Sequence, residues 1–220
     1  MSEHDHGHHH DSDHHHGHQH DQGLKGLLRY LRFLPSMWRS DVNNAVVERV
    51  APASGDIVVD IGAGMGSGVV PAARTGATVI AVEPTNYMRA ILNARKMVQR
   101  ARKQITVTEG TAEQLGLADD SATVVIAVNA MHHWSDIEAA AGEIARILKP
   151  GGRVLLVDEQ FRDPEHPDFT RHDEKHDHEF EEAELDKTVN AITAAGLVNV
   201  EGKYEKIADV PVLAFFATAG

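Results

Sequence analysis

The sequence predicts an α/β fold with a seven-stranded sheet, in which five parallel strands are followed by a C-terminal antiparallel hairpin and helices cover both faces. Apolar, strand-like runs alternate with amphipathic helical segments between residues 57 and 157. No helix fits between the last two runs, Val198–Tyr204 and Val212–Thr218, so these strands must be antiparallel neighbours. Glycines crowd directly after the first run, where such folds bind their ligands.

Two helices are expected before the sheet. Leucines recur with helical spacing over residues 24–34, with basic residues between them, and this helix ends before Pro35. A second helix is expected over Asp41–Val50. We therefore divide the chain into a helical cap at residues 23–52 and a main domain at residues 53–220.

The main domain is expected to alternate strands and helices. The five parallel strands are predicted at Ile57–Asp60, Thr78–Val82, Ile105–Thr108, Ala122–Val128 and Arg153–Val157. Helices are predicted up to about Gly76, over Asn86–Arg102, over Ile137–Leu148, and from about Glu181 to Gly196. The Pro-Gly-Gly sequence at residues 150–152 is expected to separate the third of these helices from the fifth strand.

Composition excludes several classes of function. The chain has no cysteine, which excludes disulfides, zinc ribbons, iron–sulfur clusters and thiol nucleophiles. Lys and Arg number 21 against 33 Asp and Glu, and the formal net charge of -12 argues against a nucleic-acid partner. No apolar run approaches the ~20 residues of a transmembrane segment. Because the N-terminus also lacks an apolar signal-peptide core, a cytoplasmic location is expected.

Histidines are unevenly distributed. Ten of the sixteen lie in residues 1–20, which contain no Leu, Val, Ile, Phe, Tyr or Trp. Residues 1–22 are therefore expected to be a disordered tail that binds divalent metal weakly, with an expression tag or a ligand-free extension as alternatives. His172 and His176 are one helical turn apart if their segment is helical, a spacing that can chelate Zn, Ni or Cu, although a solvated polar lid is the favoured interpretation.

The glycine-rich segment Asp60–Gly66 carries the main functional signal. Glycine allows the backbone to approach a ligand closely, and Glu83, 21 residues beyond Gly62, can accept both hydrogen bonds from a ribose diol. An adenosine-containing ligand is therefore expected. A dinucleotide fingerprint would place its third glycine at Ser67, so the spacing disfavours the alternative of an NAD-dependent oxidoreductase.

Residues 58–66 resemble the first motif of class I S-adenosylmethionine-dependent methyltransferases, in particular the small-molecule, type 11-like branch. Further segments resemble that family's motifs in the same order, namely Ala81–Met88, Glu109–Leu115, Asn129–Trp134 and Leu148–Arg153. The resemblance covers about residues 36–218. It implies a Rossmann-like fold, S-adenosylmethionine as cofactor, and methyl transfer to an oxygen, nitrogen or carbon nucleophile of a small molecule.

The resemblance also implies the cofactor contacts. The glycines would approach the methionine moiety and the ribose, and Glu83 would hold the ribose hydroxyls. Tyr87 or Met88 would pack on the face of the adenine, and residues 111–113 would contact its edge. Asn129 would lie near the methionine ammonium. The implied cofactor-binding set is Asp60, Gly62, Gly64, Gly66, Glu83, Tyr87, Met88, Thr111, Ala112, Glu113 and Asn129. The family often has Asp in place of Thr111.

Two histidines, His132 and His133, follow the fourth strand beside the expected methyl group. Histidine titrates near neutral pH and can act as a general base. A packing or positioning role is the alternative, and it is common at this place in the family. Asp158 and Glu159 end the fifth strand on the same edge and are weaker candidates. A histidine-rich metal-binding protein on a methyltransferase scaffold is the non-enzyme alternative.

Overall fold

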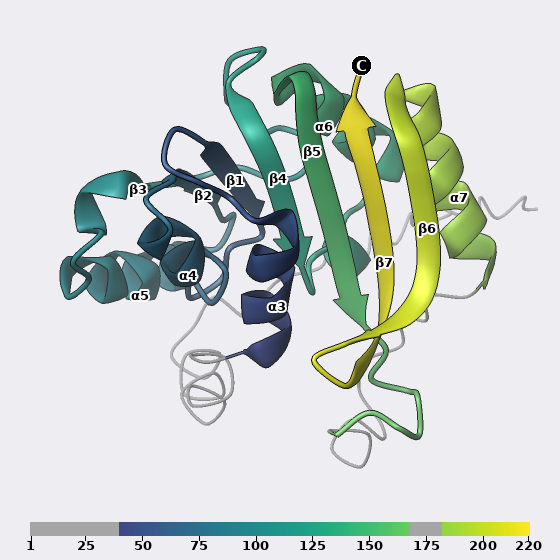
Figure 1. The fold of residues 1–220 in the computed structure, drawn as a ribbon, viewed down its shortest axis with the longest axis horizontal. Coiled ribbons are helices and arrows are strands. Elements are labelled where there is room, and N and C mark those ends of the chain that lie inside the picture. Colours follow the sequence, from purple (N-terminus) through teal and green to yellow (C-terminus); the bar gives the residue numbers. More distant parts are fainter. Residues whose placement is uncertain (1–39, 168–181) are drawn as a thin grey trace, which may run out of the picture.

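A single mixed sheet of seven strands organises the computed structural model, which describes residues 40–167 and 182–220 (Figure 1). The strands are β1 (Ile57–Ile61), β2 (Thr78–Val82), β3 (Ile105–Thr108), β4 (Ala122–Val128), β5 (Leu148–Glu159), β6 (Leu197–Ile207) and β7 (Val210–Ala219). Their order in the sheet is β3-β2-β1-β4-β5-β7-β6. Strands β1 to β5 are parallel, and β7 runs antiparallel between β5 and β6. The predicted fold class is confirmed.

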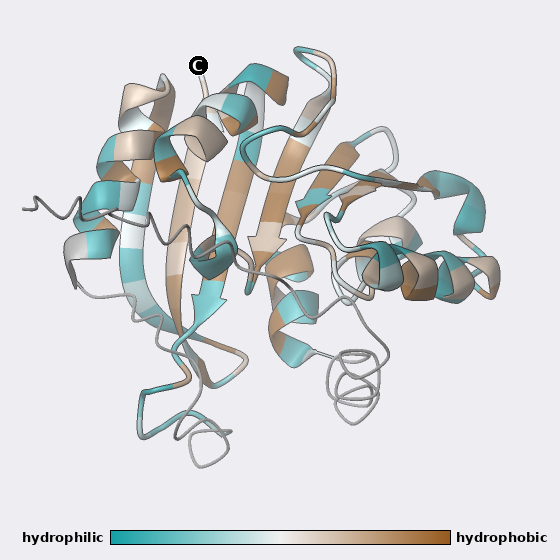
Figure 2. Ribbon diagram, turned by 180° about the vertical axis from the view of Figure 1, so that it is seen from behind, coloured by the Kyte–Doolittle hydropathy of each residue, from teal (hydrophilic) through white to brown (hydrophobic). Residues whose placement is uncertain are grey.

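Helices pack on both faces of this sheet. They are α3 (Asp41–Val50), α4 (Val69–Arg74), α5 (Asn86–Met97), α6 (Ile137–Ile147) and α7 (Glu182–Ala194), with short 3-10 helices η1 (Arg102–Gln104) and η2 (Met131–His133). One hydrophobic core joins α3, α4 and α5 to the sheet, and the other joins α6 and α7 to the opposite face. Figure 2 shows that the central strands are the most hydrophobic part of the chain. Burial from both sides explains their continuous apolar runs.

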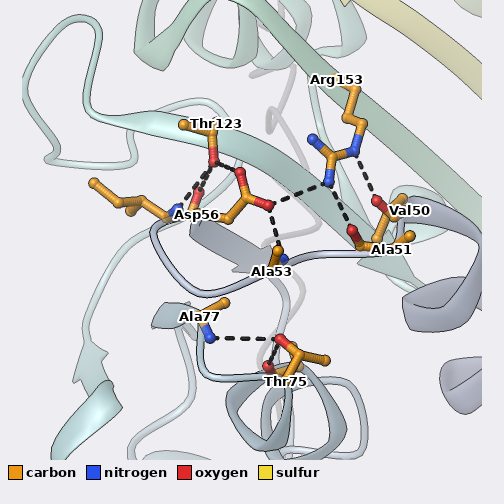
Figure 3. Close-up of polar contacts among 10 residues, drawn as sticks. Val50, Ala51, Ala53, Asp56, Thr75, Ala77, Thr123 and Arg153 are labelled. Carbon is orange, nitrogen blue, oxygen red and sulfur yellow. Dashed lines mark hydrogen bonds and ion pairs between the residues drawn. The ribbon is translucent and has the colours of Figure 1, made fainter.

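A polar cluster fixes the N-terminal ends of three parallel strands (Figure 3). The carboxylate of Asp56 accepts hydrogen bonds from the Thr123 hydroxyl (2.7 Å) and the Ala53 N–H (2.9 Å), and it pairs with Arg153. Arg153 also donates to the carbonyl of Val50 at the end of α3 (2.7 Å). Burial alone would raise the pKa of Asp56, but these hydrogen bonds and the guanidinium hold it below its usual range. The cluster lies at the sheet edge opposite the glycine loop.

Two predicted boundaries were wrong. Helix α5 ends at Met97 rather than Arg102, because Met97 and Val98 are 66% and 78% exposed and their side chains add no buried contact that would stabilise another turn. Strand β5 begins at Leu148, which pairs with Ala122, so α6 ends one residue earlier than expected and the Pro-Gly-Gly sequence lies within the strand. A register shift near this pairing accommodates the glycines.

Several predictions fall outside the described residues. These are the helix over residues 24–34, the tail at residues 1–22, and the pair His172 and His176. Within residues 40–167 and 182–220, no helix has both the length and the apolar character needed to cross a membrane.

Candidate active site

The carboxyl ends of β1, β2, β4 and β5 meet at one edge of the sheet, which we call the rim. It comprises residues 60–68, 83–85, 129–135 and 158–160, which lie in strand ends, in loops and in the 3-10 helix η2. Parallel α/β sheets bind ligands at this edge, near the point where the strand order reverses between β1 and β4. The rim gathers most of the residues that the sequence singled out.

The glycine loop needs its glycines for two reasons. Gly62 has a φ of +70°, and a Cβ there would lie 2.6 Å from the Cβ of Ala130. Gly66 has a φ of +85°, and a Cβ there would overlap the Leu92 side chain of α5. Backbone conformation and close packing therefore both exclude larger residues. The loop is also held by Arg95, which donates to the Met65 carbonyl (2.9 Å).

Arg95 was not predicted as a site residue. It is buried at 6% exposure, and burial together with the nearby Arg74 lowers its pKa to about 10, so it stays charged at neutral pH. The contact joins residues 30 positions apart. No local pattern in the sequence of α5 distinguishes this arginine from the exposed basic residues around it.

Glu83 lies where the cofactor prediction requires a carboxylate. It is 5% exposed, and its two oxygens accept hydrogen bonds from the Gly64 N–H and the Thr85 N–H, both at 2.8 Å. Each carboxylate oxygen can accept a second hydrogen bond. Glu83 can therefore hold the glycine loop and still accept hydrogen bonds from a ribose diol, which fits S-adenosylmethionine.

Asp60 is a second buried carboxyl beside Glu83, with 3% exposure. Burial and the charge of Glu83 together raise the pKa of Asp60 to about 8. At neutral pH the folded protein therefore keeps Asp60 protonated. A protonated carboxyl thus lies next to the residue expected to bind the ribose.

The residues predicted to surround the adenine lie on two segments next to the rim. Tyr87 and Met88 belong to the first turn of α5, and Met88 is buried. Thr111, Ala112 and Glu113 follow β3, and Ala112 is buried while Thr111 is exposed. Their contacts with adenine stay predictions.

The carboxylate of Glu113 is occupied within the protein. Its Oε1 accepts hydrogen bonds from the Ser135 N–H (2.7 Å) and hydroxyl (3.0 Å). Burial alone would raise the pKa of Glu113, but backbone hydrogen bonds and the hydroxyls of Thr111 and Ser135 lower it overall. Glu113 thus ties the loop after β3 to the start of α6.

Asn129 and Glu159 form two hydrogen bonds with each other between the ends of β4 and β5. The Asn129 Nδ2 donates to Glu159 Oε1 (2.7 Å), and its Oδ1 accepts the Glu159 N–H (2.8 Å). The other oxygen of Glu159 lies 3.0 Å from Nε2 of His166, whose side chain is 1% exposed and packs on Phe161. His166 was not predicted as a site residue.

Asp158 organises the segment that carries the two candidate bases. Its carboxylate is buried, and it accepts hydrogen bonds from the N–H groups of Ala130 (3.0 Å), Met131 (3.3 Å) and His132 (3.0 Å). Its Oδ2 also lies 2.9 Å from Nδ1 of His132. The His132 side chain is 25% exposed, and its ring centroid is 4.0 Å from that of the exposed His133.

The metal prediction gains no support from the part of the chain that the structure describes. Within residues 40–167 and 182–220, no group of three or more His, Asp or Glu side chains is arranged to hold a metal ion. His172 and His176 lie outside these ranges, so their role stays a prediction.

The strand order, the glycine loop and the carboxylate after β2 are the features expected of a class I S-adenosylmethionine-dependent methyltransferase. Sequence comparison agrees, since residues 59–156 match the family described as "Methyltransferase domain". These residues are therefore a methyltransferase domain of this class.

Individual relatives match over the same part of the chain. YafE of Escherichia coli is 38% identical over 96 residues, which cover 44% of this chain and 45% of YafE. The uncharacterized methyltransferase YcgJ of Bacillus subtilis is 37% identical over 119 residues, 52% of this chain and 46% of YcgJ. The matched segment thus spans less than half the length of either relative.

Solved structures share the fold at low sequence identity. Phosphoethanolamine N-methyltransferase 2 of Haemonchus contortus, in complex with S-adenosyl-L-methionine, superposes with a TM-score of 0.70 at 19% identity. The superposition covers 89% of this chain and 57% of that one. At this identity the likeness establishes the fold alone.

Proposed function

We propose that the protein transfers the methyl group of S-adenosylmethionine to an oxygen, nitrogen or carbon nucleophile of a small molecule. The observation that carries this proposal is the hydrogen bond between Glu83 and Gly64, which puts a buried carboxylate against the glycine loop. The rim adds a histidine, His132, fixed by a buried carboxylate beside the same loop. The methyltransferase family match and the S-adenosylmethionine-bound neighbour support the same chemistry.

Different residues at and beside the rim would bind different parts of S-adenosylmethionine. Glu83 would accept the ribose hydroxyls, and the backbone of Gly62, Gly64 and Gly66 would lie along the methionine and ribose. Tyr87 and Met88 would contact one side of the adenine, with residues 111–113 at its edge. When bound, S-adenosylmethionine supplies a methyl group on a positively charged sulfur, which is already activated for transfer. The protein then has to orient the acceptor and, where needed, take its proton.

Other parts of the proposal rest on the sequence. Residues 23–52 would form an N-terminal helical cap, of which the helix expected over residues 24–34 would cover the active site, and residues 53–220 would be the catalytic domain. Weak metal binding by residues 1–22 is proposed as a separate property of the tail. A small-molecule acceptor fits the net charge of -12, and a cytoplasmic location is proposed with it.

Ligand binding and product formation test this function. Thermal unfolding should show stabilisation by S-adenosylhomocysteine and none by NAD. A screen of acceptors for S-adenosylhomocysteine release, with and without divalent metal, should then identify the nucleophile. Stabilisation by NAD alone would indicate an oxidoreductase. Loss of all cofactor affinity on removal of residues 1–22, with tight nickel or zinc binding by the full chain, would favour the metal-binding alternative.

A further inference from the structure

We propose that His132 is the general base, acting through Nε2, that Asp158 positions it, and that the acceptor presents a hydroxyl group to this base. The proposal rests on the methyl-transfer function and narrows it in two ways. It selects one of the two candidate histidines, and it selects the chemical class of the nucleophile.

The position of Asp158 is fixed by the backbone. Three consecutive N–H groups, those of Ala130, Met131 and His132, donate to this one carboxylate, which is 1% exposed. A buried carboxylate with this many donors is held in one orientation. The remaining lone pair of the Asp158 carboxylate can therefore accept a hydrogen bond from a neighbouring side chain in one fixed direction.

The side chain that reaches it is His132. Its Nδ1 lies 2.9 Å from Asp158 Oδ2. Because an ionised carboxylate only accepts hydrogen bonds, Nδ1 must carry the proton, and in the neutral ring Nε2 then has a free lone pair. The same carboxylate would stabilise the imidazolium that forms once Nε2 takes a proton. This arrangement leaves Nε2 as the nitrogen that can take a proton.

The presence of a general base indicates the chemical class of the methyl acceptor. A neutral amine attacks a sulfonium methyl with its own lone pair and can lose its proton to solvent afterwards. A neutral hydroxyl is a poor nucleophile, so its proton has to leave as the new bond forms. Asp158 already accepts four hydrogen bonds, so it has no lone pair left to bind a cationic amine.

The transfer step balances without another reactant. The acceptor O–H bond breaks and its proton goes to Nε2 of His132, while the oxygen forms a bond to the methyl carbon. The methyl–sulfur bond breaks, and its electron pair stays on sulfur, which becomes neutral. The products are a methyl ether, S-adenosylhomocysteine and a protonated His132, which later returns its proton to solvent.

The tautomer of His132 can be measured without an acceptor. Nitrogen-15 NMR of histidine-labelled protein, with His132→Gln to assign the signals, should show a proton on Nδ1 and none on Nε2. In Asp158→Asn the amide can donate to Nδ1, so the proton should move to Nε2. S-adenosylhomocysteine affinity should stay within about threefold in both variants. A wild-type ring protonated on Nε2 would overturn the proposal, whereas loss of S-adenosylhomocysteine binding by wild type would instead contradict the proposed function.

Turnover tests the acceptor class with paired compounds, each phenol or enol screened beside the amine of the same skeleton. S-adenosylhomocysteine release should occur with the hydroxyl member. His132→Gln should then lower kcat about 10²–10⁴-fold with little change in KM, and the acidic limb of the pH–rate profile should disappear. The His132 ring contacts the titratable side chains of Asp158 and His133, so His133→Gln is compared in parallel.

The control for Asp158→Asn is Asp119→Asn, which makes the same chemical change at a side chain that is 74% exposed and pairs with Arg146. The control should keep wild-type turnover. Release from the amine members alone, or from neither member in protein that binds S-adenosylhomocysteine, would overturn the acceptor class. Loss of the acidic limb in His133→Gln rather than His132→Gln would overturn the choice of base.

Discussion

Replacing Glu83 with Gln separates the two tasks assigned to this side chain, which are holding the glycine loop and binding the cofactor ribose. Gln keeps the size of Glu but offers only one acceptor oxygen, so its amide must face either the Gly64 N–H or the Thr85 N–H. A hydrogen bond to a charged group contributes about 1.5–3 kcal/mol. Losing one such bond to the ribose, and weakening the other, should cost about 2–3 kcal/mol of cofactor affinity, or about 30- to 140-fold in Kd.

The same variant should also be less stable in the absence of ligand. One backbone N–H is left unsatisfied in a buried site, at a cost of about 1–3 kcal/mol, which lowers Tm by about 2–10 °C. Calorimetry with S-adenosylhomocysteine and thermal unfolding measure the two effects separately. Glu201→Gln, at a 60% exposed side chain on β6, is the matched control and should change neither. A lower Tm with unchanged affinity would show that Glu83 supports the loop but does not touch the ribose.

Three further changes test the rest of the site. Deleting residues 1–22 should leave Tm and S-adenosylhomocysteine affinity unchanged in metal-free buffer, because the segment lacks core-forming residues; a large fall in Tm would show that it packs. The raised pKa of Asp60 means that the folded state keeps a proton which the unfolded chain releases above about pH 4. Stability should therefore fall as pH rises towards about 8, by up to ~1.4 kcal/mol per unit, and Asp60→Asn should flatten this dependence in pH-resolved unfolding. Gly62→Ala should destabilise the fold more than Gly55→Ala in denaturant titrations, because both positions have positive φ but only the first overlaps Ala130; equal losses would indicate backbone strain alone.

Patterns along the chain were enough to predict the sheet. Apolar runs identified all seven strands, and the missing helix before the last strand predicted the antiparallel hairpin. The ends of α5 and α6 were misjudged because they depend on what the neighbouring side chains contact. Met97 and Val98 look apolar in sequence, yet they face solvent.

The sequence predicted those parts of the site whose residues lie close together along the chain or recur at a regular spacing. The glycine loop and Glu83 follow from spacing along one strand–helix–strand unit. The pairs Asp158–His132 and Glu159–Asn129 join residues 26 and 30 positions apart, at the end of β5 and after β4. They depend on the register in which Val128 lies opposite Val157, and neither strand encodes that register by itself.

The three N–H groups gathered by Asp158 have a consequence for motion at the rim. Ala130, Met131 and His132 lie in a connection after β4 that would ordinarily exchange its amide hydrogens quickly, yet all three donate to one buried carboxylate. Such amides exchange only when the local structure opens. We expect hydrogen–deuterium exchange to be as slow there as in the adjoining strand. Residues 130–132 would then stay ordered while ligands bind and dissociate, and any movement that admits a ligand would occur in other segments.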